Sequence, residues 1–207
     1  MENIRKHYKE VFRFMQGRVM GLYWVCLLSF LGLAVMVYFQ ALDNPDFTAQ
    51  IVGDLVASFD SKGVYDENRK ISLFSLLLNN VVAAGAAVGW GAIPFIFLSI
   101  PMLAVNAIVM GLVAAYGTMQ GISMVSLLAG ILPHGIFEIP ALMLSVALGL
   151  NLCLQTSKRI FQREGGPPLS WIFLTTFKNF ALVVIPLLVL ASLIETYVTV
   201  HIMNFFL

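Results

Sequence analysis

The chain has 207 residues, of which 59% are apolar and only 11% are charged, and its mean hydropathy is +0.89. Soluble domains carry about 25% charged residues, so this chain has too few charges to cover a water-facing surface, and most of it must be solvated by a lipid bilayer. Twelve basic residues against eleven acidic ones give a net charge of +1, which excludes the basic surface that nucleic-acid binding requires.

Residues 1–20 are polar and basic, and an apolar run over 21–40 follows them. This run is too long for the apolar region of a secretory signal, and bulky Phe39 precedes Ala41 where a cleavage site needs small residues. Because about 20 apolar residues cross a hydrocarbon core of roughly 30 Å, we expect an uncleaved first transmembrane helix over 21–40. The acidic segment 41–70 has apolar residues at helical spacing, which predicts an amphipathic helix on the extracellular membrane surface.

The next apolar stretch is long enough for two spans, which we expect over 71–98 and 101–119. The break is expected beside Pro101, because proline favours the start of a helix over its interior. Gly85 and Gly89 form a G-x-x-x-G pair in the first of these spans. This pattern is typical of close helix packing and of dimer contacts, so a homodimer is among the expectations.

The apolar stretch 122–156 is interrupted at Pro133–Gly135, which predicts a broken or re-entrant fourth segment. Non-helical backbone at membrane depth is tolerated only where it is buried in protein or lines a wet cavity. A basic loop over 157–169 and a last span over 170–194 follow. The expected fold is therefore all-α and integral to the membrane, a single domain with about five transmembrane helices.

The charge pattern predicts how these spans are oriented. The positive-inside rule places the basic segments 1–20 and 157–169 in the cytoplasm and the acidic segment 41–70 outside. The N-terminus is then cytoplasmic and the C-terminus extracellular. A fixed-period repeat is not visible, which argues against a repeat-built transporter.

Five polar residues inside the apolar segments stand out as candidates for a functional site. An acidic side chain at the bilayer centre costs about 2.5–3.5 kcal/mol on insertion scales. Counting about 1.5 Å per helical residue from the expected ends places all five toward the outer leaflet, so a shared site is allowed. They are Asn79, Asn80, His134, Glu138 and Glu195.

The most specific part of this set is the pair His134 and Glu138, which are four residues apart. On a continuous helix this spacing puts an imidazole and a carboxylate on one face, and with Glu195 they offer three metal ligands, zinc by their chemistry. The asparagine pair would support such a site. The second histidine of H-E-x-x-H is missing, and a helix starting near Phe137 would leave His134 in the preceding turn. Hydrogen bonding within the bundle is the alternative for each residue.

Three functions remain open from the residues alone. The first is a multi-span scaffold, and the second is a membrane-embedded zinc-dependent hydrolase in which Asn80 polarises a substrate carbonyl. The third is a small-solute transporter, for which a broken helix and buried carboxylates are generic support. Catalytic residues are not identified, because no nucleophile has an adjacent base.

The segment 131–141, ILPHGIFEIPA, resembles the stage II sporulation protein M family, together with the preceding asparagine pair and the segment 193–197, LIETY. The length, the basic N-terminus and the five-span plan are similar too, so the resemblance covers nearly the whole chain. It implies a bacterial cytoplasmic-membrane protein in a membrane-anchored complex with a peptidoglycan-hydrolysing partner, which thins the septal wall and drives engulfment of the forespore. We therefore expect a scaffold for cell-wall-remodelling partners that carries a candidate metal site.

Overall fold

The computed structural model describes residues 14–61, 72–161, 168–199 and 201–202. Within these residues every regular element is helical, which confirms the predicted all-α fold. The α-helices are α2 (Met20–Leu42), α3 (Pro45–Ser61), α4 (Leu73–Trp90), α5 (Ser99–Met119), α6 (Met124–Phe161), α7 (Leu169–Asn179) and α8 (Ile185–Ile194). Three π-helical turns adjoin them, η1 (Met15–Val19), η2 (Phe180–Val184) and η3 (Glu195–Thr199).

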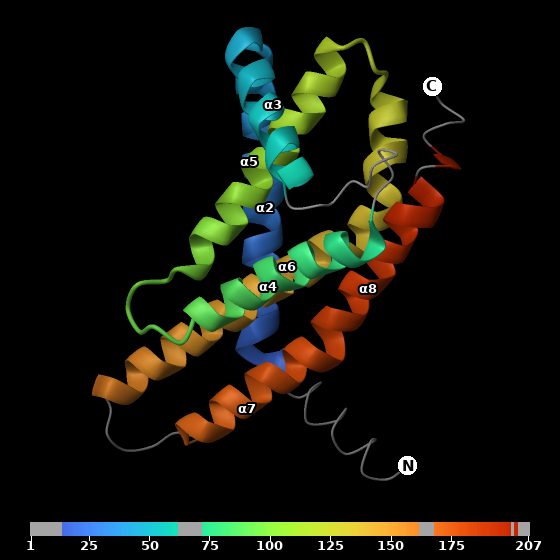
Figure 1. Cartoon of the computed structure of the whole chain (residues 1–207). Helices are drawn as coiled ribbons and strands as arrows, with labels where there is room; N and C mark the ends of the chain where they lie inside the picture. Colours follow the sequence, from blue (N-terminus) through green and yellow to red (C-terminus); the bar gives the residue numbers. More distant parts are fainter. Residues whose placement is uncertain (1–13, 62–71, 162–167, 200, 203–207) are drawn as a thin grey trace.

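Five helical segments of the described chain are long and apolar enough to cross a membrane, which confirms the predicted number of spans. They are Met15–Leu42, Leu73–Trp90, Ser99–Met119, Met124–Ile160 and Leu169–Thr199. Figure 1 shows α4, α6 and the α7–α8 segment running side by side, with α2 crossing α6 and α5 packed along α2. Helix α6 contacts α2, α4, α5, α7 and α8, so it is the centre of the bundle.

The fourth span is continuous, and the prediction of a broken or re-entrant segment is corrected here. Helix α6 runs from Met124 to Phe161 with Pro133 and Pro140 inside it. Figure 1 shows this helix changing direction in its first half, where the ribbon passes from yellow to gold. An internal proline removes one backbone hydrogen bond and its ring presses on the preceding turn, so it bends a helix whose neighbours hold it in place.

The second span is shorter than the expected 71–98, because α4 ends at Trp90 and residues 91–98 form a non-helical loop. Phe95 and Phe97 in this loop have φ angles of 69° and 51°, a left-handed conformation that is unfavourable for bulky residues. The Phe95 backbone N–H donates to Ser157 Oγ of α6 at 3.0 Å, so a hydrogen bond holds this loop against α6.

The predicted amphipathic helix falls within α3, which turns back beside α2 and α5 (Figure 1). Thr48 and Val52 are buried on its inner face, and Thr48 Oγ1 donates to the Ala41 carbonyl at 3.0 Å. The rest of the acidic segment, 62–70, lies outside the described residues. Most of the two basic segments that carried the predicted orientation lies outside them as well.

Glycines set how closely the spans approach one another. A Cβ atom at Gly149 of α6 would overlap the carbonyl oxygen of Ala87 in α4, and a Cβ at Gly111 of α5 would lie 2.6 Å from the Ala34 carbonyl oxygen in α2. Close backbone contact through small residues is the usual way in which spans pack without a hydrophobic driving force. Positions 111 and 149 therefore act as the tight crossing points of the bundle.

The predicted G-x-x-x-G pair makes no such approach within this chain. A Cβ at Gly89 would meet nothing within 4 Å, and one at Gly85 would lie 3.7 Å from the Phe180 ring. Gly89 is exposed on the surface of α4. A homodimer through this face stays a prediction.

Candidate metal centre

The five polar residues predicted from the sequence all line one cavity of about 290 Å³. Every candidate span contributes to its wall, and Phe59 of α3 adds to it. Most of the wall is apolar and includes Leu76, Val109, Met110 and Ile139. The polar lining residues are Asn79, Asn80, Asn106, His134, Glu138 and Glu195. Polar side chains from four of the five spans, α4, α5, α6 and the end of the α7–α8 segment, thus meet in one place.

His134 and Glu138 lie on one face of α6, four residues apart, with His134 Nε2 4.0 Å from Glu138 Oε2. The doubt about their spacing is removed, because α6 is helical through both residues. Glu195 reaches the cavity from another span, where α8 passes into η3. One ligand atom from each of the three residues lies within 4.8 Å of the others. The structure therefore brings together the three predicted ligands from two separate spans.

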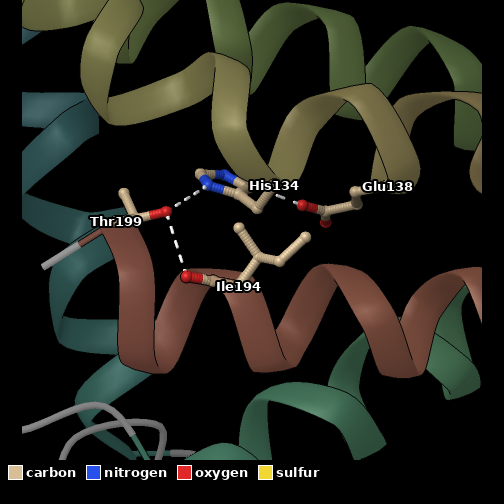
Figure 2. A network of polar contacts seen from close by, with 4 residues as sticks. All are labelled: His134, Glu138, Ile194 and Thr199. Atoms are coloured by element: carbon tan, nitrogen blue, oxygen red, sulfur yellow. Dashed lines mark hydrogen bonds and ion pairs between the residues drawn. The ribbon is translucent and has the colours of Figure 1, made fainter. Parts of the chain in front are cut away.

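The ring of His134 is oriented by Thr199. Figure 2 shows the imidazole between Thr199 on one side and Glu138 on the other. His134 Nδ1 lies 3.3 Å from Thr199 Oγ1, which itself donates to the Ile194 carbonyl oxygen at 3.3 Å. A hydroxyl has one hydrogen, so Thr199 accepts from Nδ1–H and leaves the Nε2 lone pair facing Glu138. Metal-ligating histidines are commonly oriented in this way by a second hydrogen bond.

The arrangement of His134 predicts an effect of Thr199 on metal affinity. Thr199→Val keeps the shape of the side chain but removes the hydrogen-bond acceptor, so metal affinity is expected to fall about 10–100-fold. Thr199→Ser should restore it, since the hydroxyl is retained. Competition with a chromophoric chelator measures the affinity, and equal affinities in wild type and Thr199→Val would contradict the proposed orientation.

The side chains of His134, Glu138 and Glu195 can ligate a divalent metal after small movements toward one another. Tetrahedral zinc with bonds of about 2.0–2.2 Å places its ligand atoms about 3.3 Å apart. The His134–Glu138 separation of 4.0 Å approaches this value, and the spread of 4.8 Å across the group requires side-chain movements of about 1 Å. One nitrogen and two carboxylate oxygens are typical zinc ligands, and the adjoining cavity leaves a position for a fourth ligand.

Asn80 stands out among the amide residues of the cavity. Its side chain is 7% exposed, and its Nδ2 has no hydrogen-bond partner among the described residues. The side chain lies near the Glu138 carboxyl and interacts with it. The Asn106 amide, by contrast, donates to the Met102 carbonyl at 2.7 Å.

Asn106 and Thr199 were not predicted from the sequence. Asn106 is the one amide side chain in 99–119, and the energetic argument applied to the other two asparagines identifies it equally well. Thr199 carries no such signal, because threonine is common in spans. His201, another histidine near the C-terminal end, is exposed and bonds to the Tyr197 carbonyl at 2.8 Å, outside the ligand group.

These features define a multi-pass membrane protein with a carboxylate-containing cavity where its spans meet. The family described as Stage II sporulation protein M matches residues 23–200, so the chain belongs to this family. An uncharacterized protein of Methanocaldococcus jannaschii is 27% identical over 143 residues, which cover 69% of this chain and 79% of that protein. No solved structure matches the chain. The family resemblance of the sequence is thereby confirmed.

Proposed function

We propose that this chain is a multi-span membrane scaffold whose cavity binds one divalent metal, zinc, through His134, Glu138 and Glu195. The observation that supports this proposal is the convergence of an imidazole and two carboxyl groups within 4.8 Å inside an apolar bundle. Two carboxylates at this distance repel each other unless a cation or a proton lies between them. A bound metal would also link α6 to the segment that follows α8. This link would make one end of the bundle more rigid.

Metal content tests this proposal directly. Wild-type protein purified in detergent without chelator is expected to contain about one zinc per chain, and His134→Ala and Glu138→Gln are expected to lose it. His201→Ala is the matched control, because it removes an exposed histidine outside the ligand group and should retain the metal. Elemental analysis of samples that elute as folded protein gives the result. A folded wild type without stoichiometric metal would disprove the zinc site.

The scaffold role extends to partners through the family. We propose that the chain lies in a bacterial cytoplasmic membrane, with its N-terminus inside, and assembles with a membrane-anchored complex that hydrolyses the cell wall. The family description, a stage II sporulation protein, supports this role. A photo-crosslinking residue at Phe47 on α3 should yield adducts with a wall hydrolase in sporulating cells, whereas one at Leu28 on α2 should not. Both side chains are exposed, at 63% and 67%, so accessibility does not distinguish them.

A second candidate function is a membrane-embedded metal-dependent hydrolase. The observation that favours it is the cavity of about 290 Å³ beside the three predicted ligands. Its wall includes the Asn80 Nδ2 group, which has no hydrogen-bond partner among the described residues. A metal in this position supplies an activated water when bound. Hydrolysis of an acyl amide or ester by zinc-loaded protein, lost in Glu138→Gln, would support this function over a purely structural metal.

A further inference from the structure

We infer that the cavity is a binding site for a neutral carbonyl group on an apolar chain, an acyl amide or ester, whose oxygen is shared by the metal and the Asn80 amide. This inference rests on the proposed metal site. Three independent features of the cavity support it, namely its charge balance, its unpaired donor and its apolar wall.

The charge balance selects a neutral ligand. Two glutamate carboxylates balance one divalent cation, and His134 is neutral when only Nδ1 carries its hydrogen. Among the described residues, those that line the cavity include no lysine or arginine. An anionic ligand such as a carboxylate or phosphate would therefore bring an uncompensated negative charge into a site of low dielectric, which is strongly unfavourable.

The unpaired donor selects an oxygen acceptor. The Asn80 Nδ2 group offers only N–H donors, and it is buried without a partner among the described residues. A buried donor left unpaired costs about 1–3 kcal/mol, which a carbonyl oxygen in the cavity would recover. Because Asn80 interacts with Glu138, this donor lies beside the ligand group. A metal and an amide N–H converging on one oxygen favour a polarised carbonyl.

The apolar wall indicates that the rest of the ligand is an apolar chain. Leu76, Val109, Met110 and Ile139 surround the polar groups, together with Phe59 from α3. A volume of about 290 Å³ holds about ten groups of the size of a water molecule, at about 30 Å³ each. An eight-carbon acyl amide has ten non-hydrogen atoms, so octanamide is a probe of suitable size.

The experiment uses the full chain in detergent, loaded with Co²⁺ so that ligand binding changes the visible spectrum. Octanamide is expected to shift the cobalt bands saturably and to bind at least tenfold more tightly than octanoate, compared at equal mole fraction in the micelle. Asn80→Leu should bind one Co²⁺ per chain as wild type does but lose about tenfold in octanamide affinity. Asn179→Leu is the matched control and should stay within about twofold of wild type, since this buried amide does not line the cavity and its Nδ2 already donates to the Thr175 carbonyl.

Each outcome separates this inference from the proposal on which it rests. Failure of the wild type to bind cobalt overturns the metal site and the carbonyl site together. Stoichiometric cobalt with no response to octanamide, or with tighter binding of octanoate, leaves the metal site standing and overturns the carbonyl site. The comparison of the two probes uses wild-type protein alone, so misfolding of Asn80→Leu does not affect it.

Discussion

Glu195→Gln is expected to raise the melting temperature of the metal-free protein and to lower that of the metal-loaded protein. Without metal, two carboxyl groups lie within 4.8 Å of one another in an apolar bundle, and glutamine removes one of the opposed charges. If both are ionised, their repulsion is about 3 kcal/mol at an effective dielectric constant of 20. With metal, the same substitution removes a ligand, and with it most of the stabilisation by binding.

The size of both shifts can be estimated. A metal present at a hundred times its dissociation constant stabilises the folded state by about 2.7 kcal/mol. One kcal/mol shifts the melting temperature of a chain of this size by about 2–4 °C, so each shift should be several degrees. Thermal unfolding in detergent, with added zinc and with chelator, measures them.

Two further variants control this measurement. Glu138→Gln should show the same change of sign, since it removes the other carboxylate. His134→Ala should lose the stabilisation by zinc without the rise in the metal-free state, because it leaves the carboxylate pair in place. If Glu195→Gln lowers the melting temperature equally with and without zinc, the cluster is a hydrogen-bonded packing feature instead.

The candidate ligands were predictable from the sequence because charged side chains are costly in a membrane. His134, Glu138 and Glu195 stand out in apolar segments, and the alternation of spans places them at the same depth. Thr199 could not be found in this way, because its role depends on a hydrogen bond across 65 positions of the chain. Contacts between spans follow from the angle and rotation of each helix, which a hydropathy pattern does not contain.

The number of spans was predictable for the same reason, but the shape of the fourth was not. Pro133 and Gly135 indicate a weakened helix, and the sequence alone does not say whether packing holds the two halves together. In the structure α6 contacts five other α-helices, and its central residues Met143, Leu148 and Leu152 are completely buried. These contacts favour a bent helix over a broken one.

Gly149→Ala is expected to destabilise the protein by up to about 2.5 kcal/mol, while Gly89→Ala is expected to stabilise it slightly. Alanine is favoured over glycine in a helix by about 0.5–1 kcal/mol, so with no other effect both variants would gain stability. A Cβ at Gly149, however, would overlap the Ala87 carbonyl oxygen and crowd Ser99 Oγ, whereas one at Gly89 has open space around it. Overpacking at a backbone contact costs about 1–3 kcal/mol, which exceeds the gain in helix propensity.

The Gly149 contact also couples the fold to the candidate metal centre. Gly149 and Ala87 lie on the helices that carry Glu138 and Asn80, and Ser99 Oγ donates to the Ala87 carbonyl at 2.7 Å beside this contact. Separating α4 from α6 would move Asn80 away from Glu138, so Gly149→Ala should lower octanamide affinity as well as melting temperature. Gly89→Ala should change octanamide affinity by no more than about twofold and the melting temperature by no more than about 2–4 °C. Wild-type stability in Gly149→Ala would mean that the two helices are not held in close contact at this point.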